Sequence, residues 1–132
     1  AAPDPRERAL LDAILAGVAA PTRARVVALA GQLTLAELAA ITAPARLFVG
    51  VDSAPMHIAA AMQTPVVALF GPSGEVEWGP WGVIAQVVAS DRHPCRPCGQ
   101  DGCGGGKVSE CLTTLPVARV HDAARAILAA VA

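Results

Sequence analysis

Residues 47–62 read Leu-Phe-Val-Gly-Val-Asp-Ser-Ala-Pro-Met-His-Ile-Ala-Ala-Ala-Met, and this stretch decides the fold class. The apolar run Leu47–Val51 is typical of a buried strand, and the alanine-rich run Pro55–Met62 is typical of a helix. Asp52 stands where the strand gives way to the helix, and it is the only Asp, Glu, Lys or Arg in residues 47–74. A carboxylate at the carboxyl end of a buried strand lies where open α/β sheets bind ligands.

The first turn of this predicted helix is suited to an anion. Free backbone N–H groups and a partial positive charge gather there, which favours phosphate. We predict that Ser53, Ala54, Met56 and His57 form this ligand-binding turn, while Pro55 lacks an N–H and is tolerated at a helix start. Other interpretations remain: Asp52 could serve as the helix N-cap, water could satisfy the N–H groups, His57 could be a local cap, and Met56 could pack in the core.

Strand-like and helix-like runs alternate along the rest of the chain. The predicted strands are Arg25–Leu29, Leu47–Val51, Val66–Phe70 and Val83–Val88. The predicted helices are Arg8–Ala20, ended by Pro21; a helix capped by Thr34 and Glu37 in a capping-box pattern; Pro55–Met62; and Pro116–Val131. The segment Asp91–Glu110 reads as a loop rich in Gly and Cys. This alternation predicts an α/β fold, with a Rossmann-like parallel sheet and helices on both faces.

The composition agrees with that fold and reduces the number of function classes that fit the chain. Hydrophobic residues make up 54% of the 132 residues and charged residues 16%, which suits strands buried on both faces. The net charge of −1 offers no electrostatic case for nucleic acid. No apolar run has the roughly 18–20 residues that cross a bilayer, and the polar start does not resemble a signal peptide. We therefore expect a cytoplasmic protein.

Two motifs together resemble one family. Asp52-Ser53-Ala54-Pro55-Met56-His57-Ile58-Ala59-Ala60-Ala61, followed by Thr64-Pro65-Val66-Val67-Ala68-Leu69-Phe70-Gly71-Pro72-Ser73, is similar to the donor-binding signature of the ADP-heptose:lipopolysaccharide heptosyltransferases, which form glycosyltransferase family 9. Ala54 departs from the pattern, since many members carry Gly there. The resemblance runs from about Leu29 to the C-terminus.

The resemblance implies an architecture and a set of partners. Family members have a GT-B arrangement of two Rossmann-like domains, with the acceptor and general base in the N-terminal domain and the nucleotide-sugar in the C-terminal one. Residues 1–132 would then be an incomplete C-terminal domain that lacks its first strands. The implied substrates are ADP-heptose and the lipopolysaccharide inner core, with no cofactor required, at the inner face of the bacterial inner membrane. Self-association through the missing strands is a further expectation.

The resemblance also implies roles for individual residues. The Asp52 carboxylate would bind hydroxyls of the donor sugar, and the turn from Ser53 to His57 would face the diphosphate. Leu33 would pack near the adenine, with plain core packing as its alternative. Gly71 and Ser73 would lie beside the donor pocket, although the same residues also suit an ordinary turn. No catalytic residue is expected within these 132 residues.

Four cysteines occupy the predicted loop and its end, as Cys95-x2-Cys98-x4-Cys103-x7-Cys111. Four thiolates can bind zinc tetrahedrally, and the first pair has the usual knuckle spacing. We favour structural thiols, with zinc and redox chemistry as alternatives. Trp78 and Trp81 are interpreted as packing residues.

Two other function classes fit the same residues less well. One is a non-catalytic nucleotide-binding or assembly module. The other is a protein similar to a sugar-nucleotide epimerase, against which the stretch from Asp52 to His57 argues.

Overall fold

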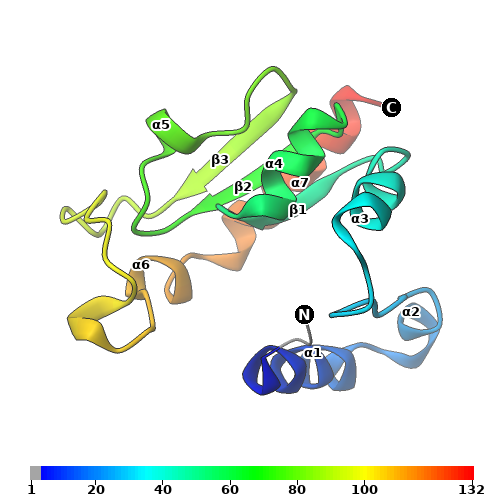
Figure 1. Ribbon diagram of the computed structural model, residues 1–132, viewed down its shortest axis with the longest axis horizontal. Coiled ribbons are helices and arrows are strands. Elements are labelled where there is room, and N and C mark those ends of the chain that lie inside the picture. Colours follow the sequence, from blue (N-terminus) through cyan, green and yellow to red (C-terminus); the bar gives the residue numbers. More distant parts are fainter. Residues whose placement is uncertain (1–3) are drawn as a thin grey trace. The chain divides into compact units, whose positions relative to one another are not determined.

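The computed structural model describes residues 4–132, which form two compact units divided between Glu37 and Leu38. The ribbon in Figure 1 labels their helices and strands.

The first unit contains two helices, α1 (Pro5–Gly17) and α2 (Ala20–Arg23). Asp4 caps α1, because its side chain accepts a hydrogen bond of 2.8 Å from the backbone N–H of Arg6. The predicted helix therefore exists but ends at Gly17. Pro21 does not end a helix; it lies in the first turn of α2, where a missing N–H costs no hydrogen bond.

The predicted strand Arg25–Leu29 is wrong, since this segment has no strand structure. Val26 and Val27 are 45% and 77% exposed, and no residue from Asp4 to Glu37 is buried. A strand needs a neighbour for its backbone N–H and C=O groups. The segment is apolar enough for a strand, but it has no partner strand in its unit.

The second unit is a helix-covered sheet. Its helices are α3 (Leu35–Thr42, which starts in the first unit), α4 (Ala54–Ala61), α5 (Glu75–Trp78), α6 (Glu110–Thr113), α7 (Val117–Ala130) and the 3₁₀ turn η1 (Cys103–Gly105). Its strands are β1 (Phe48–Val51), β2 (Val66–Phe70) and β3 (Ala85–Ala89). The sequence missed α5 and α6, which have 4 residues each and show too little periodicity to detect.

The predicted capping box is present at the start of α3. The carboxylate of Glu37 accepts from the backbone N–H of Thr34 at 2.8 Å, and the Thr34 hydroxyl accepts from the N–H of Glu37 at 3.2 Å. The bond from the Thr34 N–H is the main cause that lowers the pKa of Glu37 below its usual value of 4.5.

The sheet has three parallel strands in the order β1-β2-β3. Phe48 pairs with Val66, and Val66 pairs with Ala85. Strand β3 begins and ends slightly later than the predicted Val83–Val88. The expected Rossmann-like parallel sheet is confirmed, because helices cover both of its faces.

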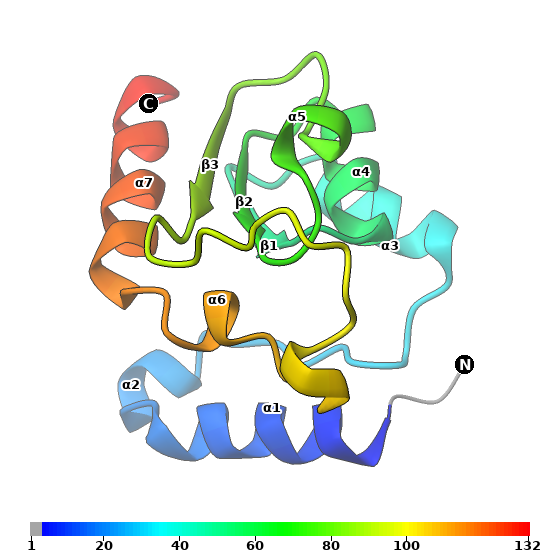
Figure 2. The ribbon, with the colours of Figure 1, turned by 90° about the vertical axis from the view of Figure 1, so that its left-hand side faces the viewer.

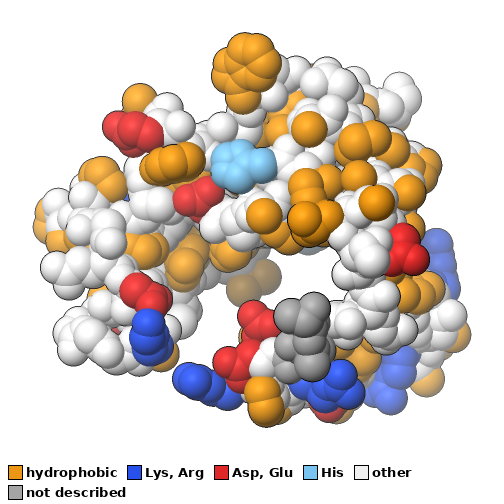
Figure 3. Space-filling view, in the orientation of Figure 1, with side chains coloured by type: hydrophobic (Ala, Val, Ile, Leu, Met, Phe, Trp, Pro, Cys, Tyr) orange, Lys and Arg blue, Asp and Glu red, His pale blue; other side chains and the backbone are white. Residues whose placement is uncertain are grey.

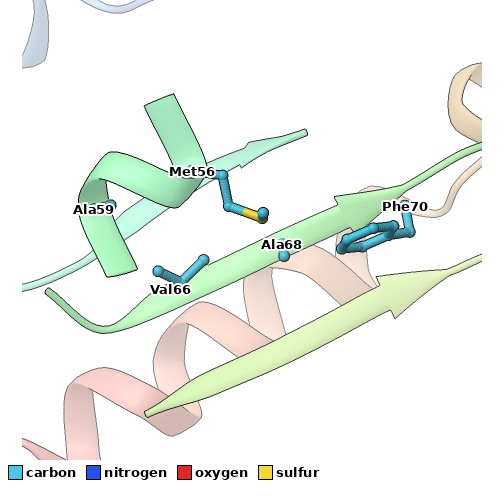
Figure 4. Close-up of a cluster of buried hydrophobic side chains, with 5 residues drawn as sticks. All are labelled: Met56, Ala59, Val66, Ala68 and Phe70. Atoms are coloured by element: carbon cyan, nitrogen blue, oxygen red, sulfur yellow. The ribbon is translucent and has the colours of Figure 1, made fainter. Parts of the chain in front are cut away.

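Strand β2 is the centre of the core, because its alternate residues serve opposite faces. Val66, Ala68 and Phe70 pack with Met56 and Ala59 of α4 on one face (Figure 4). On the other face Val67 packs with Val88, Ala123 and Ile127. Figure 2 shows the sheet between α4 and α7. This sandwich holds the carboxyl ends of the strands at one edge.

The two tryptophans are not packing residues. Trp78 is 59% exposed and Trp81 is 89% exposed, so the interpretation from sequence is wrong. Within residues 4–132, no helix is both long and apolar enough to cross a membrane.

Candidate functional site

Two of the residues that the sequence singled out, Asp52 and Gly71, lie at the carboxyl edge of the parallel sheet. Asp52 follows β1 directly, and its backbone N–H donates to the carbonyl of Leu69 at 3.2 Å. Gly71 follows β2 directly. The strands are parallel and in register, so Asp52 and the loop that starts at Gly71 emerge at the same edge.

An acid and an imidazole form a pair at this edge. Oδ1 of Asp52 lies 3.5 Å from Nε2 of His57, and the two side chains are 20% and 45% exposed. In the face shown in Figure 3, a histidine ring lies open to solvent next to an acidic side chain. The pair offers a carboxylate that accepts hydrogen bonds from hydroxyls and an imidazole that can donate one.

The Asp52 carboxylate does not cap α4. Ser53 occupies the N-cap position, but its hydroxyl donates to the carbonyl of Val51 at 3.1 Å rather than capping the helix. Pro55 stands in the first turn as expected, and the N–H of Ala54, at the first helical position, has no acceptor within the helix. The positive end of α4 therefore comes directly after Asp52 in the chain.

Met56 belongs to the core. Its side chain is fully buried against Phe70, and its N–H donates to the carbonyl of Ser53 at 3.0 Å. These contacts match the packing alternative. The predicted contact between Met56 and the ligand remains untested. In this structure the buried Met56 side chain is not accessible to a ligand.

The loop after β2 runs from Gly71 to Glu75, and residues from later segments of the chain contact it. Gly71 is buried, and a Cβ added there would lie 2.7 Å from Cδ1 of Leu112 in α6. The carbonyl of Pro72 accepts a hydrogen bond from the N–H of Gly99 at 2.9 Å. Ser73 is half-buried. The position of this loop therefore depends on residues that come much later in the chain.

Sequence reasoning missed Arg96 and Glu75. Nη2 of Arg96 donates to Oε2 of Glu75 at 2.9 Å, and the Arg96 side chain is only 8% exposed. A hydrogen bond from its own backbone N–H is the main cause that lowers the pKa of Glu75, and Arg96 lowers it further, while partial burial opposes both. Nothing in the local sequence marks the pair, because β3 separates the two residues.

Leu33 lies in the first unit, where it is half-buried. The expected contact of Leu33 with adenine stays a prediction.

The four cysteines all line one pocket of about 260 Å³, together with Pro72 and His93. Cys111 is buried, and the other three are exposed. Burial is the main cause that raises the pKa of the Cys111 thiol above its usual value of 9.0. Among residues 4–132, no group of three or more His, Cys, Asp or Glu side chains has the geometry to hold a metal ion. The zinc alternative therefore gains no support from the arrangement of the thiols.

These features define a parallel α/β domain of the Rossmann-like class, with an acid–imidazole pair beside a helix N-terminus at the carboxyl edge of its sheet. The chain belongs to glycosyltransferase family 9, the heptosyltransferase family, whose sequence profile matches residues 1–108. The resemblance seen in the sequence is thereby confirmed.

Individual relatives agree with this assignment. The chain is 47% identical over 79 residues to lipopolysaccharide heptosyltransferase 3 of Escherichia coli, which covers 60% of this chain and 22% of the relative. It is 39% identical over 72 residues to lipopolysaccharide heptosyltransferase 1 of Pseudomonas aeruginosa, covering 54% of this chain and 20% of that one. The chain thus spans about a fifth of the length of these two relatives.

Solved structures have the same fold. The E. coli ADP-heptose lipopolysaccharide heptosyltransferase II matches with a TM-score of 0.71 and 29% identity, over 89% of this chain and 32% of that one. A family 9 glycosyltransferase of Veillonella parvula matches with a TM-score of 0.67 over 95% of this chain. At 24% identity, the second match supports the fold alone.

Proposed function

We propose that this chain is the nucleotide-sugar-binding part of a glycosyltransferase that moves heptose from ADP-heptose to the lipopolysaccharide inner core. The observation that carries the proposal is the partly exposed Asp52 carboxylate, 3.5 Å from His57 and next to the start of α4. Membership of the heptosyltransferase family selects heptose among the sugars that such an edge accepts.

Each part of the edge has a task in this proposal. The carboxylate of Asp52 accepts hydrogen bonds from hydroxyls of the donor sugar, and the N-terminus of α4 attracts the diphosphate. His57 donates to a phosphate oxygen or to the heptose. As ADP leaves, the same positive helix end stabilises the negative charge that develops on it. No cofactor is required for these steps.

Acceptor binding and proton removal are assigned to a second, N-terminal domain of the whole enzyme. A carboxylate of that domain acts as the general base toward the acceptor hydroxyl. We expect these 132 residues alone to transfer no heptose. We place the whole enzyme at the inner face of the bacterial inner membrane, where the acceptor is a lipid.

Strand β1 is an edge of the three-stranded sheet, and its outer side is the natural place for further strands of the same domain. When those strands are lacking, we expect the chain to associate with itself there. Sedimentation velocity of the purified chain tests this: a concentration-dependent dimer is expected, and a strict monomer contradicts it.

Binding of the donor is the direct test of the main proposal. We would titrate ADP and ADP-heptose into the wild-type chain, Asp52→Asn and the control Asp122→Asn, which changes an exposed carboxylate on α7. Loss of one hydrogen bond between a carboxylate and a hydroxyl weakens binding by about tenfold or more. We therefore expect Asp52→Asn to weaken binding of ADP-heptose and to leave ADP almost unaffected.

Two results would contradict the assignment. One is equal affinity of the wild-type chain and Asp52→Asn for ADP-heptose. The other is a comparable loss in Asp122→Asn, which would mean that any lost carboxylate has this effect. Heptose transfer catalysed by the 132-residue chain alone would disprove the division of labour between two domains.

A further inference from the structure

Arg96 joins three segments of the second unit through a single buried side chain. Its Nε donates to the carbonyl of Gly71 at 2.7 Å, and its Nη1 donates to the carbonyl of Ser90 at 3.3 Å. Its Nη2 donates to the Glu75 carboxylate at 2.9 Å, and the side chain is only 8% exposed. Gly71 follows β2, Ser90 follows β3, and Glu75 begins α5.

This arrangement needs the shape of arginine. A guanidinium has five N–H donors in a fixed planar fork, so it can serve three acceptors from one position. A lysine ammonium is a point charge on a flexible stem and does not reproduce that fork. Burying a charge is unfavourable unless a partner of opposite charge and further hydrogen bonds compensate, and Glu75 and the two carbonyls provide both.

Two further contacts join the Gly71–Glu75 loop to residues that follow Arg96 in the chain. The N–H of Gly99 donates to the carbonyl of Pro72 at 2.9 Å. A Cβ added at Gly74 would lie 3.7 Å from Cβ of Pro97, so the two backbones are close. Arg96, Pro97 and Gly99 all come from the cysteine-bearing loop after β3. That loop therefore holds the Gly71–Glu75 loop at the ligand-binding edge.

We infer that Arg96 is a positioning residue, which fixes the Gly71–Glu75 loop in the conformation that receives the sugar nucleotide. This inference rests on the proposed function, because it makes donor affinity depend on a side chain that does not touch the donor. It also gives the cysteine-bearing loop a task that needs no metal and no redox step.

The first arm of the test measures order in the loop without any ligand. We would record ¹⁵N relaxation of the wild-type chain, Arg96→Ala, Arg96→Lys and the control Arg92→Ala, which changes an exposed arginine of the same loop. Rigid backbone has order parameters near 0.85 and flexible backbone has values below about 0.6. We expect Gly71, Ser73 and Gly74 to move from the first range toward the second in Arg96→Ala and partway in Arg96→Lys.

The second arm measures the affinity for ADP-heptose in the same proteins and in Glu75→Gln, which keeps the shape of that side chain. Loss of loop order should raise Kd by about tenfold, the equivalent of one lost hydrogen bond. Arg92→Ala should keep the wild-type value. Ile127→Val, in the core on the opposite face, should lower the urea midpoint without changing Kd.

The outcomes separate this inference from the proposed function. Unchanged order parameters in both Arg96 variants overturn the inference, whether or not ADP-heptose binds. A loosened loop with unchanged Kd also overturns it, and so does a rise in Kd that Ile127→Val reproduces. If the wild-type chain binds no ADP-heptose, the proposed function fails for this chain. The order parameters alone then decide whether Arg96 fixes the Gly71–Glu75 loop. If Arg96→Ala does not fold, Arg96→Lys and Glu75→Gln give the same decision.

Discussion

Two apolar segments of this chain have similar composition and different structures. Arg25-Val26-Val27-Ala28-Leu29 forms no strand, whereas Val66-Val67-Ala68-Leu69-Phe70 is the central strand of the sheet. Val27 is 77% exposed and Val67 is fully buried. Both segments are rich in residues that favour strands, so strand propensity does not explain the difference.

The difference lies in the neighbours of each segment. Strand β2 has a parallel strand on each side and a helix on each face, so its backbone groups are paired and its side chains are covered. Within the first unit, residues 25–29 have no such neighbours. Hydrophobic sequence makes a strand competent to form, and tertiary pairing decides whether it does.

Truncation of a side chain in each segment should give the largest contrast. Phe70→Ala removes a fully buried ring, and changes of this kind cost about 3–5 kcal/mol. Val27→Ala changes an exposed side chain, for which the expected effect lies within about 0.5 kcal/mol. Urea unfolding of both variants measures the two values. Similar losses of stability would mean that residues 25–29 are structured in solution after all.

Replacing one glycine of each unit by alanine should change the free energy of unfolding by smaller amounts, and the two changes should have opposite signs. Gly71→Ala forces a Cβ to within 2.7 Å of Leu112, and such overpacking costs about 1–3 kcal/mol. Gly17→Ala meets nothing within 4 Å at the end of α1, where alanine should gain at most about 1 kcal/mol. Thermal unfolding of the two variants tests the signs. A tolerated Gly71→Ala would show that α6 moves freely.

Thiol reactivity should separate buried from open positions within the second unit itself. Cys95, Cys98 and Cys103 are exposed, whereas Cys111 is buried with a raised pKa. The thiolate is the reactive form, so Cys111 should react much more slowly with a thiol reagent at neutral pH. Mass spectrometry after timed alkylation identifies the order. A tightly held zinc ion and four protected thiols would instead restore the metal alternative.

The smallest expected effect concerns two carboxylates, one from each unit. The pKa values of Glu37 and Glu75 are both lowered from 4.5. Each lowered pKa adds stability above the ordinary pKa of the unfolded chain, and this stability is lost as the pH falls through the folded value. When the carboxyl ¹³C shifts are followed by NMR as the pH is lowered, both carboxylates should take up their protons only below pH 4.5.

Arg96→Lys sharpens this comparison. The Glu75 pKa should rise toward its usual value but stay lowered, because the hydrogen bond from its own backbone N–H is the larger cause. The Glu37 pKa should not move, since its partner is Thr34. A Glu75 pKa above 4.5 in the wild-type chain would contradict the structure.

Most of the candidate site could be predicted because its signals are local. The run Leu47–Val51 and the Asp-Ser-Ala-Pro-Met-His sequence lie next to each other, and so the strand end, the carboxylate and the helix start were readable together. Arg96 and Glu75 could not be found in this way. Their contact spans a whole strand, and neither residue belongs to a pattern that marks an ion pair.

The sequence by itself determined the fold class, the position of Asp52 at a strand end and the capping of α3. These features depend on hydrophobic periodicity and on hydrogen bonds between residues a few positions apart. Only the tertiary structure decided which apolar runs become strands, that Met56 packs inward, and that the cysteine-bearing loop fastens the Gly71–Glu75 loop through Arg96. Those outcomes depend on partners distant in sequence, because burial and backbone pairing are properties of the assembled fold and not of any single segment.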